Sequence, residues 1–249
     1  MMGRLLTTGR LQAALAGDVH VLGGAARSAG SSAPTPILDF PSPAIARFIG
    51  ASFPGSPSPR VRLRRAHAAI GRLTRPVYGI DELQPASTTL RRGRGSCSQR
   101  LAVLEAVARG QGIVTRSRGL LVDGRFWAAR FGVLAPVLPD LVVIAWPEFR
   151  LDDGWLSASD LFAGDADAEA NAAGPFTNEG PETLFDAITR GAASWTAGGP
   201  SGLHRFLRRD LGTFDSRDHL FARHGQNLPR PVRRLADPVF RHWSAGSHR

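Results

Sequence analysis

Apolar residues recur at helical spacing in three stretches of the first 110 residues. Residues 42–50 open with a serine and a proline, which suit the cap and the first position of a helix. Residues 60–75 place arginines on one face of a second predicted helix and apolar side chains on the other. A third helix is predicted after residue 97 and ends at a pair of glycines, with Leu101, Leu104 and Ala108 on one face.

Strand patterns follow this third helix. Residues 113–122 and 125–134 are predicted strands on either side of an Asp-Gly turn at 123–124. Residues 141–151 form the strongest strand pattern, and a turn at 152–154 leads into a short return strand beginning at Trp155. Helices followed by antiparallel strands predict an α+β fold, with an antiparallel sheet packed on the helix that begins near residue 97.

The remaining segments set the predicted domain organisation. Residues 22–36 are rich in glycine, serine and proline, and residues 163–182 are acidic and broken by two prolines, so both are predicted loops. Residues 78–90 are predicted to be an irregular connection, whereas 182–196, 202–211 and 217–224 have helical patterns. We therefore expect an N-terminal extension over 1–36, a core domain over 37–165, and a loop with a helical C-terminal extension over 166–249.

The charge is unevenly distributed. The net charge is +10 and every basic residue is arginine, with basic ends flanking an acidic centre between residues 101 and 199. Basic ends suit an acidic partner such as a carrier protein, and they are equally compatible with an ordinary solvated surface. Because no zinc knuckle, helix-turn-helix or aromatic-basic stripe is present, we do not expect nucleic acid as the partner.

Other features narrow the class of protein. No apolar run approaches the ~20 residues that a membrane helix needs, and no export signal is evident. A single cysteine, Cys97, excludes an internal disulfide and fits the reducing cytoplasm. The Gly-x-Gly before it lacks the lysine of a phosphate-binding loop. We expect no membrane, no cofactor and no metal.

Cys97 is the strongest candidate for chemistry. It follows two glycines, Gly93 and Gly95, and stands at the predicted start of a helix. The N–H groups and the positive dipole end of a helix start stabilise a thiolate and can hold an oxyanion. This arrangement is typical of a cysteine nucleophile, although a lone cysteine is also often an inert, buried thiol.

About half of the chain, from residue 37 to 162, resembles the transglutaminase-like superfamily. Four motifs carry the resemblance in order: Gly-Arg-Gly-Ser-Cys at 93–97 with the helix at 101–109, the turn at 112–116, the strand Ala-Trp-Pro-Glu-Phe at 145–149, and the segment from Gly154 to Asp160. The resemblance implies a papain-like α+β core with a Cys-His-Asp arrangement. In that arrangement Cys97 is the nucleophile and Asp160 orients the histidine.

The family histidine is absent, because Ile144 occupies its position. Three explanations are open: a histidine from the C-terminal region (His204, His219 or His224) takes its place, the nearby Glu148 takes part, or the fold has lost its chemistry. Trp146 and Glu148 are further candidates for support of the site, and a tryptophan in such a strand is also commonly part of the core.

The resemblance implies acyl transfer, cyclisation or hydrolysis at a thioester or amide. The acyl donor would be a small molecule or would be bound to an acidic carrier protein, as in bacterial natural-product pathways. A thioester reacts more easily than an amide, so the loss of histidine harms thioester chemistry least. The alternative is a catalytically inactive binding protein with the same fold.

Overall fold

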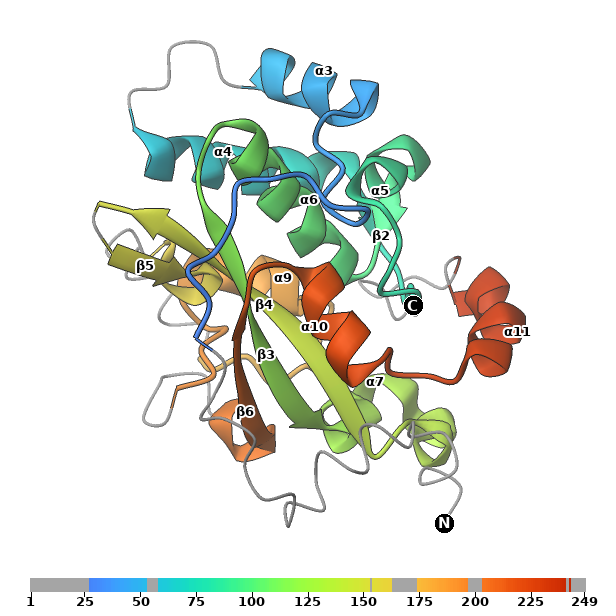
Figure 1. Cartoon of the computed structure of the whole chain (residues 1–249). Helices are drawn as coiled ribbons and strands as arrows, with labels where there is room; N and C mark the ends of the chain where they lie inside the picture. Colours follow the sequence, from blue (N-terminus) through green and yellow to red (C-terminus); the bar gives the residue numbers. More distant parts are fainter. Residues whose placement is uncertain are drawn as a thin grey trace.

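A four-stranded antiparallel sheet lies at the centre of the protein (Figure 1). The computed structural model describes residues 27–52, 58–152, 154–162, 174–196, 203–240 and 242. The strands lie in the order β5-β4-β3-β6, and their bounds are β3 (Thr115–Asp123), β4 (Leu141–Leu151), β5 (Gly154–Ser157) and β6 (Leu207–Phe214). Helices packed on an antiparallel sheet confirm the predicted α+β class.

The central helix is α6 (Cys97–Gly110), which packs against β3 and β4. Around it lie α3 (Pro43–Ser52), α4 (Pro59–Leu73), α5 (Ala86–Arg92) and α9 (Leu184–Ala187). The two helices predicted before residue 76 and the helix after Cys97 are thus confirmed, as are the strands at 113–122 and 141–151 and the return strand at 155. Residues 78–90 are not wholly irregular, because they include most of α5.

Helix α6 is buried on all sides, although its sequence pattern suggested one apolar face. Every residue from 99 to 109 is buried, including three charged ones. Buried charges need partners, and each has one: Arg109 donates to Thr115 Oγ1 (2.7 Å), Arg100 lies 4.0 Å from the centre of the Phe185 ring, and Glu105 forms an ion pair described below. The helix that begins with Cys97 is therefore fixed by both apolar and ionic contacts.

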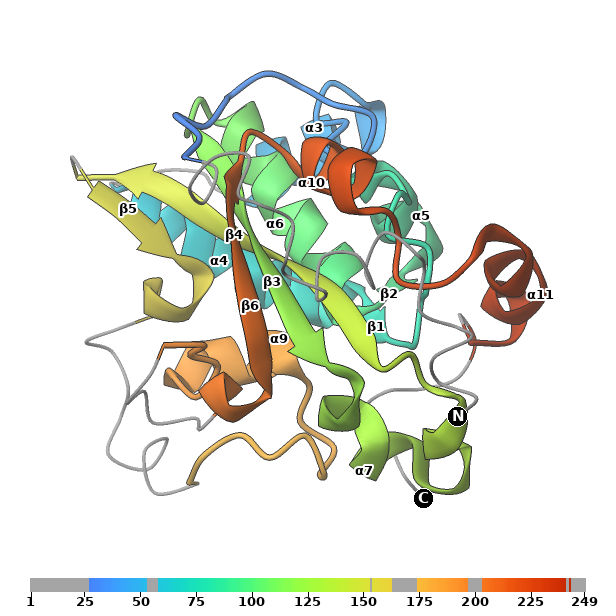
Figure 2. The same ribbon diagram turned by 60° about the horizontal axis from the view of Figure 1, so that its bottom comes forward.

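The strand predicted at 125–134 is wrong. This segment contains the 3₁₀ turn η1 (Gly124–Trp127), the helix α7 (Ala128–Phe131) and the 3₁₀ turn η2 (Gly132–Val137). The Asp123 carboxylate accepts the Arg125 N–H (2.8 Å) and so caps a helical turn. A Cβ atom on Gly124 would lie only 1.8 Å from the Pro139 carbonyl oxygen, so the chain folds back tightly there. Figure 2 shows the resulting helical segment at the end of β3 where a hairpin turn was expected.

The C-terminal region also differs from the prediction. Residues 207–214 form the edge strand β6 instead of the helix predicted at 202–211, and residues 182–196 contain only α9 and the turn η4 (Ile188–Arg190). The pattern of Leu203, Phe206 and Leu207 fits a helix locally, but pairing with β3 supplies backbone partners that the pattern cannot reveal. The sheet thus contains residues from both sides of the predicted boundary at 165.

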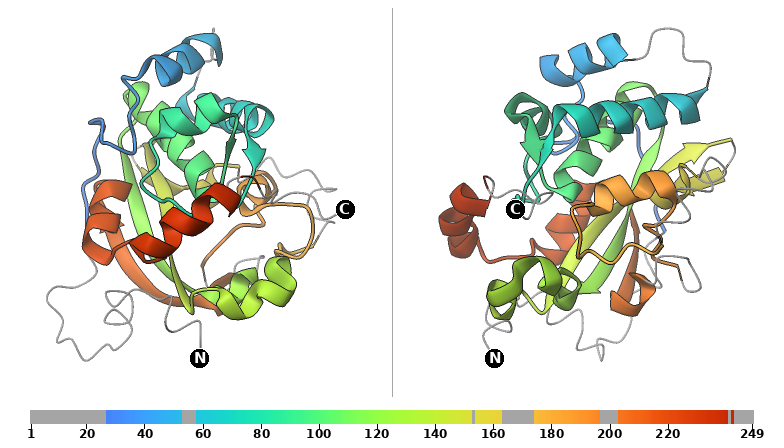
Figure 3. Two further views of the ribbon diagram at one scale, coloured as in Figure 1. Left: turned by 90° about the vertical axis from the view of Figure 1, so that its right-hand side faces the viewer. Right: turned by 180° about the vertical axis from the view of Figure 1, so that it is seen from behind.

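Two helices complete the described fold. The predicted helix at 217–224 is confirmed as α10 (Arg217–His224), and α11 (Arg230–Phe240) was not predicted. Figure 3 shows α10 and α9 on opposite sides of the sheet. A short parallel pair, β1 (Arg75–Pro76) and β2 (Arg94–Gly95), holds the chain before α6 against the chain after α4. Most of the predicted N-terminal extension, up to residue 26, and residues 163–173 of the predicted acidic loop lie outside the described residues.

Candidate active site

Cys97 is the first residue of α6, as predicted. Ser96 caps the helix: its hydroxyl accepts the Gln99 N–H (3.3 Å), and the Gln99 side chain accepts the Ser96 N–H (3.0 Å). This reciprocal capping box fixes the direction in which the chain enters the helix. The thiol is half-buried, and the helix start places it among backbone N–H groups that favour a negative charge.

The two glycines before Cys97 have separate structural roles. Gly93 ends α5 with φ +58°, in the left-handed region that glycine adopts without strain. A Cβ atom on Gly95 would lie 2.6 Å from Thr89 Cγ2, so only glycine fits between α5 and α6. Gly93 therefore allows α5 to end in a left-handed turn, and Gly95 allows α5 and α6 to lie close together just before the cysteine.

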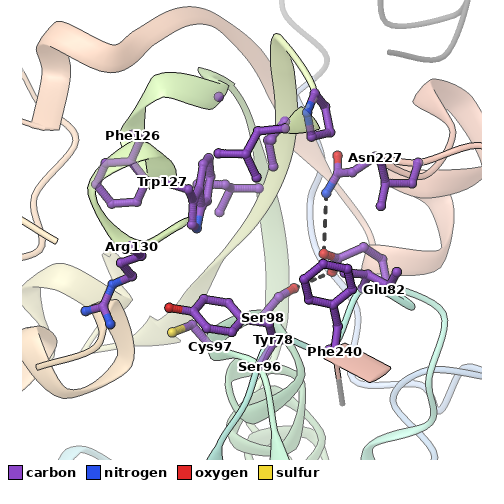
Figure 4. A pocket seen from close by; sticks show the side chains of 18 of the residues that line it. Tyr78, Glu82, Ser96, Cys97, Ser98, Phe126, Trp127, Arg130, Asn227 and Phe240 are labelled. Carbon is purple, nitrogen blue, oxygen red and sulfur yellow. Dashed lines mark hydrogen bonds between the residues drawn. The ribbon is translucent and has the colours of Figure 1, made fainter. Parts of the chain in front are cut away.

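A cavity of about 320 Å³ lies in front of Cys97 (Figure 4). Its walls come from the loop at 77–82, the start of α6, β4 at 142–144, the η1–α7 segment and α11. Ile144 lines this cavity together with Cys97, so the position at which the family histidine was expected does share a cavity with the thiol. The cavity volume is at the lower end of the range for small-molecule sites, about 300–1,000 Å³.

The polar wall beside Cys97 is built around Glu82. Its carboxylate accepts the Ser98 hydroxyl (2.6 Å), and Ser98 in turn accepts a hydrogen bond from Arg217 (3.0 Å). Burial raises the pKa of the Glu82 carboxyl, and the Ser98 hydrogen bond offsets only part of this effect. Asn227 donates to the same carboxylate (3.4 Å), and the bonds that Ser98 and Asn227 make to Glu82 are drawn in Figure 4. A carboxyl group with a raised pKa in the same cavity as a thiol is a candidate to move protons.

Asn227 also completes the free edge of β4. Its side-chain amide accepts the Val143 N–H (2.6 Å) and donates to the Val143 carbonyl (3.1 Å), as a neighbouring strand would. Strand β5 pairs with β4 only from Glu148 onward, so the edge facing the cavity depends on this asparagine. The same residue thereby joins β4 to Glu82.

Tyr78 and Arg130 form a second polar group at the cavity. Burial raises the pKa of the Tyr78 phenol, while a hydrogen bond from Arg130 opposes that shift. Arg130 is held by Asn178 and by the Glu182 carbonyl oxygen. Both residues line the cavity and are visible in Figure 4, so the phenol is a second group able to donate a hydrogen bond to a bound molecule.

None of the cavity-lining residues that the structure describes is a histidine. His219 and His224 pack edge-on against Phe214, each at 5.6 Å, and His204 is exposed in the turn η5 (Leu203–Phe206). His67 is stacked on Phe185 at 3.9 Å. None of the three C-terminal candidates is therefore placed at the thiol in this structure.

The other predicted site residues lie away from the cavity lining. Asp160 accepts the Ser157 hydroxyl (2.6 Å) after β5 and is exposed, and Glu148 forms ion pairs with Arg116 (2.5 Å) and Arg118 (2.7 Å). Trp146 is buried against Trp195, with 6.0 Å between ring centres. The fold brings Cys97 and Ile144 together and does not add Asp160, Glu148 or Trp146 to the cavity lining.

Sequence reasoning missed four polar residues that line the same cavity as the thiol, namely Tyr78, Glu82, Arg130 and Asn227. One signal was available: Asp81 and Glu82 are two of only four acidic residues in the first hundred. Within the described ranges, no group of three histidine, cysteine or acidic side chains could hold a metal ion. None of the described helices is long and apolar enough to cross a membrane.

The arrangement places a thiol and a carboxyl group in one mainly apolar cavity, which are groups that thiol chemistry requires. Known protein families, curated proteins and solved structures were all compared with this chain, and none matches it. The geometry of the site and the resemblance noted in the sequence are therefore the basis for a functional proposal.

Proposed function

We propose that this protein is a transglutaminase-like thiol enzyme with a papain-like core, in which Cys97 accepts an acyl group. The observation that carries the proposal is the position of the single cysteine, at the first residue of α6 and in the wall of a cavity. A structural thiol is normally packed inside the core. This one is half-buried at a capped helix start and lines a cavity.

The reaction follows from the groups around the thiol. The Cys97 sulfur forms a bond to the carbonyl carbon of the donor, and the bond from that carbon to the donor's sulfur or nitrogen breaks. The proton lost from Cys97 ends on the leaving group. The Gln99 N–H is donated to Ser96, so the Cys97 and Ser98 N–H groups are those of the first turn that would hold the oxyanion. Water or an amine then displaces Cys97 from the acyl group and returns a proton to its sulfur.

The absence of histidine from the described cavity lining favours a thioester donor. An amide nitrogen must be protonated before it leaves, which is the usual work of histidine, whereas a thiolate leaves without prior protonation. Glu82, with its raised pKa, is the group in the cavity suited to accept the cysteine proton and return it.

An acidic carrier protein is the proposed source of the thioester. Helix α11 forms part of the cavity wall and carries Arg230, Arg233 and Arg234, while the nearby chain before Cys97 carries Arg91 and Arg92. Positive charge around a substrate cavity steers an acidic partner toward it. Such carriers supply acyl thioesters in bacterial natural-product pathways, which is the setting we propose.

A binding protein that keeps the fold without turnover is the alternative. The specific observation in its favour is Ile144, an apolar side chain at the position where the family has its histidine. In that case the cavity would hold an acyl group or a related ligand, and Cys97 would not be acylated.

The test uses the thiol directly. Folded protein is treated with iodoacetamide between pH 6 and 7, and separately with acyl thioesters of N-acetylcysteamine, and intact mass is measured. We expect rapid alkylation and a mass increase equal to one acyl group, both absent in Cys97→Ala. A thiol that reacts only after unfolding, with no acyl adduct from any thioester, would refute the proposal and favour the binding protein.

A further inference from the structure

The cavity is lined mainly by apolar side chains, and its polar groups lie near the start of α6, at Arg130 and at Asn227. Its polar side chains include Tyr78, Glu82, Cys97 and Ser98, close to the start of α6. Most of the remaining lining is aliphatic or aromatic, including Phe126, Trp127, Leu138, Val142, Ile144 and Leu184. A carbonyl held at Cys97 therefore has an apolar space beside it.

One wall of that space is a single face of α11. Val232, Ala236 and Phe240 are spaced by four residues, so they lie along one side of the helix, and all three line the cavity. Leu235 belongs to another side and is 81% exposed. The helix is attached through Asp237, which accepts the Ile80 N–H (3.4 Å), and through Phe240, whose ring centre is 6.0 Å from that of Phe131.

The cavity's size limits its occupant. At roughly 30 Å³ for each non-hydrogen atom, the share of a water molecule in the liquid, 320 Å³ holds about ten such atoms. Among the lining residues that the structure describes, the charged ones are Glu82 and Arg130, and Arg130 already donates to the Asn178 side chain and to the Glu182 carbonyl oxygen. A second carboxylate on the acyl group would lose its hydration among apolar walls and would be repelled by Glu82.

Resting on the proposed function, we propose that the acyl group transferred to Cys97 is uncharged and apolar, with up to about ten non-hydrogen atoms, and that it packs against the α11 face formed by Val232, Ala236 and Phe240. A medium-length aliphatic chain meets this description. A dicarboxylic acyl group does not.

The first experiment measures binding without any chemistry. Straight-chain primary amides from butanamide to decanamide are titrated calorimetrically into Cys97→Ser protein, because they imitate the acyl carbonyl and cannot react. Transfer of a methylene from water to an apolar wall predicts about fourfold tighter binding per carbon, until the cavity is full. Affinity that does not rise with chain length overturns the inference.

The second experiment tests the α11 wall. In Ala236→Trp the indole occupies the cavity, so the preferred amide should become shorter by several carbons, whereas Leu235→Trp, on the exposed side of the same helix, should leave the preference unchanged. Circular dichroism confirms that both variants are folded. If Ala236→Trp does not fold, the smaller change Val232→Phe replaces it. An unchanged preference in a folded wall variant overturns the role of α11.

The two proposals fail in different ways. The thioesters of acetate, octanoate and succinate are compared for acylation of Cys97 in the wild-type protein, and we expect octanoyl to react fastest and succinyl slowest. Chain-dependent amide binding without any acylation would refute acyl transfer and leave the apolar cavity in place. Acylation that is equally fast for octanoyl and succinyl would refute the apolar substrate and leave acyl transfer in place.

Discussion

Replacing Arg217 should be among the most destabilising single changes in this protein. Its side chain joins α10 to α6 and to β4. It donates to Glu105 of α6 (2.7 Å), to Ser98 at the start of α6 (3.0 Å) and to the Ala145 carbonyl of β4 (3.0 Å). Arg217 is 1% exposed and Glu105 0%. In Arg217→Met the Glu105 carboxylate is left buried without its cation.

The expected cost follows from that burial. Removing one member of a buried ion pair typically costs about 3–5 kcal/mol, because the remaining charge stays desolvated. Glu105 still accepts the Ser117 hydroxyl (3.0 Å), so we place the loss near the middle of this range, about 4 kcal/mol. That is a large share of the roughly 5–15 kcal/mol that stabilises a typical domain.

Urea unfolding followed by circular dichroism at pH 7 measures the loss. Arg223→Met is the control, since Arg223 is an exposed arginine of the same helix, and its effect should stay within about 0.5 kcal/mol. The double variant Glu105→Gln/Arg217→Met removes both members of the ion pair, while Arg109 stays buried nearby, so the double variant should be more stable than Arg217→Met by about 1–3 kcal/mol. A loss below ~1 kcal/mol in Arg217→Met, or strictly additive losses in the two single variants, would show that the pair does not hold α10 to α6.

Three further predictions concern single groups. Burial lowers the pKa of His67 to about 4 from its usual 6.5, so the stability that the neutral imidazole contributes is complete above pH 6.5 and falls as the pH drops toward 4. About 2–3 kcal/mol of the free energy of unfolding should be lost by pH 4.5. Urea midpoints of His67→Phe should lack this part of the pH dependence. Glu82→Gln removes a carboxylate from the cavity that Cys97 also lines and should speed iodoacetamide alkylation of Cys97 at pH 7 by about three- to tenfold. An unchanged rate would mean that the carboxylate does not influence the sulfur. Ile144→His places an imidazole in the same cavity and should flatten the rise in alkylation rate between pH 6 and 8, because the imidazolium forms an ion pair with the thiolate. An unchanged pH profile in folded protein would show that residue 144 does not face the thiol.

The sequence alone determined the elements whose signals are local. Ser96 and Gln99 form a capping box, and the apolar spacing after them predicts a helix whether or not anything packs on it. The same holds for the long apolar strand β4 and for α10, which Ser216 caps by accepting the His219 N–H (3.1 Å). The two glycines before Cys97 and the apolar spacing after it predicted this helix start before any tertiary contact was known.

Tertiary structure decided the rest, because the deciding contacts join residues far apart in the chain. Residues 207–214 became a strand through pairing with β3, and the turn at Gly124 became helical through its close contact with Pro139. The surroundings of the thiol are assembled in the same way: Glu82 meets Ser98 across 16 positions and Asn227 across 145. Spacing along a single sequence carries no record of such pairs, so the motif located the cysteine and only the fold revealed what lies around it.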